Sequence, residues 1–119
     1  MDKRIILNKE GFRQIVRRVS LISQQENWLI KLMIKNSGKL FLDYEGSSVG
    51  DAHDELNIDY NGESLDIGLN QKFILDFLNI IDTSEVVMML KNPKSPVFLS
   101  PAGGENLKYI MMPIDLDGF

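Results

Sequence analysis

The feature of this sequence that most constrains its fold is a pattern that occurs twice along the chain. Each copy contains a short apolar strand, an amphipathic helix and three further strands, and the two copies fill the 119 residues. The connections between most strands are short, which favours antiparallel pairing and leaves one side of the sheets for the helices. We therefore predict an α+β fold of two βαβββ repeats, with antiparallel sheets and both helices packed on one side.

The first copy begins with Arg4-Ile5-Ile6-Leu7, a predicted strand, and continues with a helix. Asn8 is expected to cap this helix, because its side-chain oxygen can accept a hydrogen bond from a free backbone N–H group. Three strands with alternating apolar residues are then predicted at 30–34, 40–44 and 56–60, and a loop rich in Gly, Ser and Asp is predicted at 46–54. The helix itself is indicated by apolar residues at helical spacing, namely Phe12, Ile15, Val16, Val19 and Ile22.

The second copy begins after Asn61-Gly62, which predicts a tight turn. A strand over 65–69 leads to Asn70, the predicted N-cap of a second helix that ends before Asp82. Three strands are predicted to complete the copy, at 86–90, 96–99 and 107–113. The apolar residues at helical spacing in this second helix are Phe73, Ile74, Phe77, Leu78 and Ile81.

The apolar run at 109–114, with which the last predicted strand ends, has an unusual composition because Pro113 interrupts it. Proline cannot donate a hydrogen bond to a sheet, so the run should leave the sheet at or near an edge, with apolar side chains near the surface. Met111 and Met112 suit an adaptable binding surface, since the unbranched thioether can repack against different partners. The alternative is a last strand packed on one face of the core, because apolar runs are usually buried.

Composition limits the classes of function. The chain has no Cys, so it forms neither a disulfide framework nor a thiolate site, and the absence of Cys suits a reducing compartment. No apolar run approaches the roughly 20 residues of a membrane span, and the first residues lack a signal-peptide core. We expect a cytoplasmic protein without membrane contact. The net charge is −4, but residues 11–25 contain Arg13, Arg17 and Arg18 and no acid, so one helix face is basic.

Catalytic and metal sites find little support in the sequence. Asp51-x-His53-Asp54-Glu55 offers oxygen ligands and the only His, but its spacing fits no structural metal motif. The lone His leaves no catalytic triad. The glycines of Pro101-Ala102-Gly103-Gly104 lack the Lys-Ser/Thr of a phosphate-binding loop. We expect no enzymatic activity, no metal and no cofactor.

Four segments of the chain stand out together: Arg18-Val19-Ser20-Leu21-Ile22-Ser23, Leu65-Asp66-Ile67-Gly68-Leu69-Asn70, Phe73-Ile74-Leu75-Asp76-Phe77-Leu78-Asn79 and Tyr109-Ile110-Met111-Met112-Pro113-Ile114. In this order and spacing, they closely resemble the C-terminal domain of the bacterial DNA polymerase III beta sliding clamp. The resemblance implies a DNA clamp fold over residues 1–119 as a single domain, and a non-catalytic processivity factor for DNA replication. Such clamps carry three similar domains per chain, and two chains close into a homodimeric ring around duplex DNA without reading its sequence. The chain is then expected to be an excised domain, about a third of a protomer.

The resemblance also implies a hydrophobic pocket that binds linear peptide motifs. In the family, peptides of DNA polymerase subunits, the clamp loader and repair proteins dock there. A free-standing peptide-binding adaptor domain, without any ring, is the alternative function, and a small enzyme is a weaker one. Carried onto this chain, the pocket residues are Asn70, Phe73, Pro96, Ile110, Met111, Met112, Pro113 and Ile114, with Trp28 as an aromatic residue at the rim.

The basic helix face gains an interpretation from the same resemblance. Arg13, Arg17 and Arg18 are expected to face DNA and to attract phosphates without reading bases, which suits a ring that slides. Lys72 is expected to join them, although Asp76 and Asp82 weaken the case for the second helix. A solvated helix face is the alternative. At the chain end, Leu116 and Phe119 resemble peptide anchors, so residues 115–119 are a candidate occupant of a neighbouring molecule's pocket.

Overall fold

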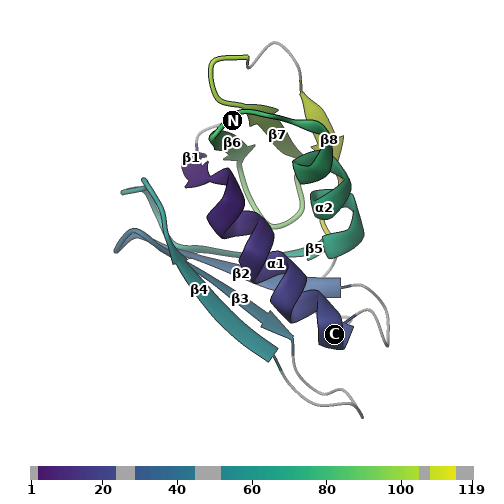
Figure 1. The fold of residues 1–119 in the computed structure, drawn as a ribbon. Helices are drawn as coiled ribbons and strands as arrows, with labels where there is room; N and C mark the ends of the chain where they lie inside the picture. The colour runs from purple at the N-terminus through teal and green to yellow at the C-terminus, as the bar shows by residue number, and fades with distance from the viewer. Residues whose placement is uncertain (1–2, 24–28, 45–51, 105–107, 115–119) are drawn as a thin grey trace.

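A computed structural model describes residues 3–23, 29–44, 52–104 and 108–114 (Figure 1). It contains the two copies in the predicted order, each a strand, a helix and three strands. The elements are β1 (Lys3–Asn8), α1 (Lys9–Ser23), β2 (Leu29–Lys35), β3 (Lys39–Tyr44), β4 (Ala52–Asn57), β5 (Leu65–Asn70), α2 (Gln71–Ile80), β6 (Glu85–Leu90), β7 (Val97–Pro101) and β8 (Tyr109–Met111).

The strands form two four-stranded antiparallel sheets, ordered β1-β6-β7-β8 and β4-β3-β2-β5. The first strand of each copy therefore pairs with the sheet of the other copy. This exchange ties the two copies together, and the helices lie next to each other on one side of the sheets (Figure 1). The predicted α+β class, the two βαβββ repeats and the antiparallel sheets are confirmed.

The core lies between the helices and the two sheets. Strand residues alternate between the two faces of a sheet, and the alternate apolar residues of β2, β3 and β5 all point to the helix side. Leu32, Leu40 and Ile67 are examples, each at most 1% exposed. Phe12 from α1 and Phe77 from α2 are also buried in the same cluster. One continuous apolar core therefore fixes how the helices sit on both sheets.

Both predicted helix caps are present. The Asn8 side-chain oxygen accepts a hydrogen bond from the Gly11 N–H at 2.7 Å, and the Asn70 oxygen accepts one from the Lys72 N–H at 2.9 Å. Each bond satisfies a backbone donor that the helix itself leaves free. The caps therefore set where α1 and α2 begin.

Two predicted local features are wrong. The fourth strand was predicted at 56–60, but β4 starts at Ala52 within the predicted loop and ends at Asn57, after which the segment makes only an isolated bridge, Ile6 with Asp59. The predicted tight turn at Asn61-Gly62 does not join two paired strands, because β4 and β5 lie at opposite edges of their sheet. The polar sequence of β4 explains the shift: Asp54 faces α1 and pairs with Arg18, so polar residues occupy strand positions that pattern reading assigns to a loop. Within the described ranges, no helix is long and apolar enough to cross a membrane.

Candidate peptide-binding groove and cationic helix face

The last apolar run leaves its sheet at an edge, as Pro113 predicts. β8 is the outermost strand of its sheet and pairs with β7 through Val97↔Met111 and its neighbours. After Met111 the pairing ends, and the Ile114 N–H donates a hydrogen bond to the Gly68 carbonyl of β5 at 2.8 Å. The chain thus passes from the edge of one sheet to the other sheet. Met112 and Pro113 form the crossing.

The side chains of this run alternate between the core and the surface. Met111 is 5% exposed, whereas Ile110 is 60% and Met112 63% exposed. Ile114 is also exposed, and Pro113 is half-buried. This edge strand and the residues after it therefore present a row of apolar side chains to solvent, while the buried side chain of Met111 packs in the core. The alternative, a last strand packed on one face of the core, accounts for the buried Met111 but not for the apolar side chains of Ile110 and Met112, which remain exposed.

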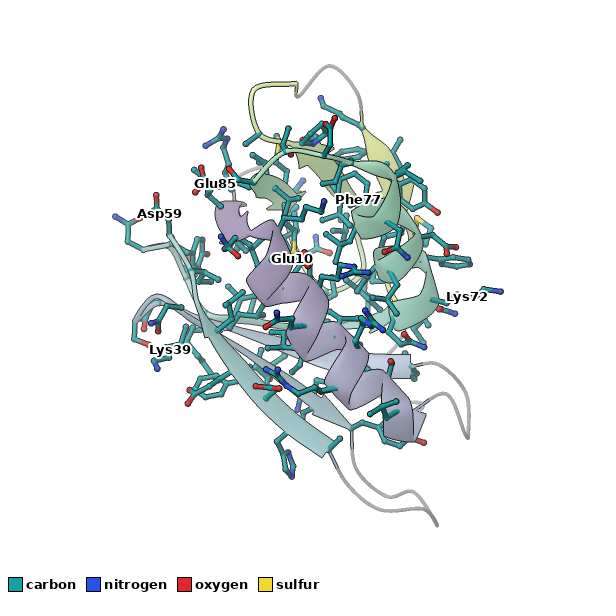
Figure 2. The ribbon with its side chains drawn as sticks, viewed as in Figure 1. Glu10, Lys39, Asp59, Lys72, Phe77 and Glu85 are labelled. Carbon is teal, nitrogen blue, oxygen red and sulfur yellow. The ribbon has the colours of Figure 1, made fainter. Side chains whose placement is uncertain are left out.

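The second wall of the site comes from the first turns of α2. Phe73, three residues after the cap at Asn70, is 47% exposed. Phe77, one turn further, packs its ring at 5.8 Å from the ring of Tyr109 and so holds α2 against β8. Between helix and strand lies a groove of about 350 Å³, lined by Phe73, Tyr109, Ile110, Met111 and Met112. Figure 2 shows α2, which carries the labelled Phe77, beside this last strand.

The structure brings together only part of the predicted pocket. Phe73, Ile110, Met111 and Met112 line the groove, and sequence reasoning missed Tyr109 as a lining residue. Its position two residues before Met111, on the same face of a strand, was the available signal.

The other predicted pocket residues lie around this lining set rather than in it. Asn70 caps α2, and its side-chain oxygen is occupied by that bond. Pro96 is half-buried directly before β7, the strand that pairs with β8. Pro113 and Ile114 continue the run beyond the groove. Trp28 lies outside the described residues.

The second candidate site is the exposed side of α1. Arg13 and Arg18 each have partners. The Arg13 Nε donates to Asn79 Oδ1 at 3.0 Å and its guanidinium pairs with Glu10 at 3.1 Å. The Arg18 Nε donates to Asp54 Oδ2 on β4 at 2.5 Å. This hydrogen bond is the main reason that the pKa of Asp54 lies below its usual range, against the opposing effect of partial burial, and it raises the pKa of Arg18.

Arg17 and Lys72 complete the predicted cationic set. Arg17 is exposed and, within the described ranges, forms no ion pair. Lys72 is exposed in the first turn of α2 and is labelled in Figure 2. Asn79, which binds Arg13 of α1, follows Lys72 by two helical turns and so lies on the same side of α2. The side chain of Lys72 itself extends away from α1 (Figure 2).

The acidic residues around the only His do not converge. His53 Nδ1 pairs with Asp43, its cross-strand partner on β3. Asp54 points to the opposite face of β4, toward Arg18, because neighbouring strand residues alternate. Among the described residues, no group of three metal-binding side chains comes together. Asp51 lies outside those residues.

Comparison with known proteins decides the family. A family model described as DNA polymerase III beta subunit, C-terminal domain, matches residues 1–115. The chain belongs to this family. The beta sliding clamp of Pseudomonas putida is 29% identical over 115 residues, which cover 97% of this chain and 31% of that protein.

Solved structures of the family have the same fold. DNA polymerase III subunit beta of Pseudomonas aeruginosa matches with a TM-score of 0.91 and 28% identity, over 97% of this chain and 31% of that one. The beta subunit of Thermotoga maritima matches with a TM-score of 0.90 and 29% identity, over 96% and 31% of the two chains. The chain spans about a third of the length of these relatives, 31%, and corresponds to their C-terminal domain.

Proposed function

We propose that this chain is the C-terminal domain of a DNA polymerase processivity factor, a sliding clamp, and that it is a non-catalytic accessory part of the replication machinery. Family membership and the shared fold support this function. In the complete protein, the domain contributes to a homodimeric ring around duplex DNA. Such a protein acts in the cytoplasm. The domain itself, residues 1–119, is proposed to be a single folding unit.

A second proposal, peptide binding, rests on the exposed apolar residues at the end of β8, which lie beside Phe73. A row of apolar side chains at a sheet edge is costly in water unless a partner covers it. The groove between α2 and β8 fits an extended peptide that places one or two apolar anchors against Phe73 and Met112. We propose that linear motifs of polymerase subunits, the clamp loader and repair proteins bind there.

The chemistry of the groove suits many clients with modest affinity. Met111 and Met112 adapt their shape to different anchors, and the aromatic rings of Phe73 and Tyr109 supply contact area with little directional demand. The hydroxyl of Tyr109 is the one polar side-chain group of this lining set. Specificity is therefore expected to come from the shape of the anchors and from contacts around the rim.

The proposal is tested by titration of a fluorescently labelled peptide, taken from a clamp-binding segment of a polymerase subunit, into wild type and Met112→Ala. Loss of a central anchor should weaken binding by about 1–3 kcal/mol, which corresponds to roughly 5- to 150-fold in Kd. Ile80→Ala is the matched control, because Ile80 is also exposed and apolar on α2 but does not line the groove. Equal affinities of wild type and Met112→Ala would contradict the assignment of the groove.

We further propose that the exposed side of α1 faces duplex DNA. Its arginines lie on a helix face with phosphate-binding chemistry, and phosphate contacts carry no sequence information. A ring that must move along DNA needs this kind of attraction. The acidic net charge of −4 does not oppose it, since a polyanion responds to the local field.

A further inference from the structure

The arginines of α1 differ in what their side chains touch. Arg13 is held in two directions: its Nε donates to Asn79 of α2 at 3.0 Å, and its Nη1 lies 3.1 Å from Glu10. Its charge is therefore balanced by a neighbouring carboxylate. The side chain also joins the two helices. A phosphate that recruits Arg13 must compete with both partners.

Arg18 is held even more closely. Its Nε lies 2.5 Å from Asp54 Oδ2, while the other oxygen of Asp54 accepts the Glu55 backbone N–H at 2.9 Å. Both oxygens of this carboxylate are thus engaged, and the pair fastens α1 to β4. The side chain of Asp54 is mostly shielded from water, which strengthens the attraction relative to a fully exposed pair.

Among the residues that the structure describes, Arg17 has no such partner. It is exposed, and within the described ranges its guanidinium forms neither an ion pair nor a hydrogen bond, although its backbone carbonyl accepts a bond from the Ser20 hydroxyl. Arg17 lines a shallow hollow of about 290 Å³ together with Gln14, Arg18 and Leu21. It therefore offers an uncompensated positive charge beside an open surface.

The second helix carries an exposed cation, Lys72, in its first turn. Lys9 Nζ donates to the Ile81 carbonyl at 2.7 Å and Arg13 donates to Asn79, so α1 and α2 run antiparallel. Arg17, one turn beyond Arg13, then lies toward the first half of α2, where Lys72 is exposed. Asp76 is the acid in that half of α2, one turn after Lys72.

We propose that Arg17 is the phosphate-contacting arginine of α1, and that Asp54 holds Arg18 out of this contact. The inference rests on the proposed DNA-facing role of α1 and assigns the residues within it. Binding of phosphate by Arg17 breaks no ion pair or side-chain hydrogen bond to another described residue. Binding by Arg18 requires the loss of the bond to Asp54, and Arg13 likewise must leave Glu10 and Asn79.

The test follows the arginine Nε–Hε signals of the 119-residue chain by NMR, during titration with a short DNA duplex at low ionic strength. In wild type, the Arg17 signal should move and the signals of Arg13 and Arg18 should not. Asp54→Asn keeps a side-chain oxygen that can accept the Glu55 N–H. In this variant, the Arg18 signal should shift as well. Glu55→Gln is the matched control: it removes the same charge from the neighbouring residue, whose carboxylate pairs with Lys39 on the other face of β4. It should leave Arg18 unmoved.

The salt dependence of binding gives a second readout. The slope of log binding constant against log salt should decrease in magnitude by about 0.9 in Arg17→Gln and increase by about 0.9 in Asp54→Asn, one phosphate contact each. Arg18→Gln should leave it unchanged. The inference is overturned if the Arg18 signal shifts as much as the Arg17 signal in wild type, or if the Arg18 signal does not shift in Asp54→Asn. Either result would leave the proposal that α1 faces DNA intact. If no arginine signal responds to duplex in any variant, the DNA-facing role of α1 itself is overturned.

Discussion

Gln71, the first residue of α2, offers the sharpest test of the energetics of this fold. Its side chain is fully buried, on the same helix face as Ile74 and Leu78, and neither its amide oxygen nor its amide nitrogen has a hydrogen-bond partner in the structure described. A buried amide that loses its bonds to water without replacement costs about 1–3 kcal/mol on the scale of protein mutational data. Gln71→Met keeps the length and approximate volume of the side chain and removes both polar atoms.

We therefore expect Gln71→Met to raise the free energy of unfolding by about 1–3 kcal/mol. The assay is urea denaturation followed by circular dichroism, with unchanged m-values as the check that both proteins unfold in the same way. The matched control is Gln14→Met, the same substitution at an exposed position of α1, which should change stability by less than about 0.5 kcal/mol. A Gln71→Met protein that is less stable than wild type would refute the reasoning, because it would mean that the amide has partners worth more than its desolvation.

Two further predictions concern stability. Gly38, in the turn between β2 and β3, has φ +86°, and a Cβ there would lie 3.4 Å from the Ile58 carbonyl oxygen. Gly38→Ala should therefore lower the free energy of unfolding, measured by urea denaturation, by about 1–2 kcal/mol. An unchanged free energy of unfolding would contradict the left-handed turn. The depressed pKa of Asp54 means that its ionised form stabilises the fold above the unfolded-state value near pH 4, and that this contribution disappears as pH falls through the lower folded pKa. The stability difference between wild type and Asp54→Asn, measured by urea denaturation, should therefore favour wild type at pH 7 and shrink toward about pH 2; a difference independent of pH would argue against the ion pair with Arg18.

The sequence predicted local structure where one residue type decides it. Asn8 and Asn70 each supply a capping oxygen, and Pro113 cannot continue a sheet, so the helix starts and the exit of the last strand followed from those side chains alone. The helical and alternating patterns also defined most elements. These features depend on neighbours along the chain, which a sequence displays directly.

Features that depend on distant partners were not predictable in this way. β1 and β5 exchange between the sheets, and nothing in either strand specifies its partner. On the helix-facing side of β4, Asp54 pairs with Arg18, a residue 36 positions away, so a polar residue occupies a position where pattern reading expects an apolar one.

The candidate sites illustrate the same limit. The arginines of α1 look equivalent in sequence, whereas the structure engages Arg13 with Asn79 and Arg18 with Asp54, residues 66 and 36 positions away. Tyr109 joins the groove only because Phe77 brings α2 against β8. The resemblance to the clamp family supplied the location of the groove, and the structure supplied its lining.

The most direct test of the docking groove is the response of the methionine methyl signals to a clamp-binding peptide. The methionines report on separate places: Met111 and Met112 line the groove, Met88 is buried in the core and Met33 lies on a strand of the other sheet. With methyl-labelled protein, a saturating peptide should shift the signals of Met111 and Met112 and leave those of Met88 and Met33 in place. If the protein is saturated with peptide and the Met112 signal does not shift, the assignment of the groove as the peptide site is contradicted.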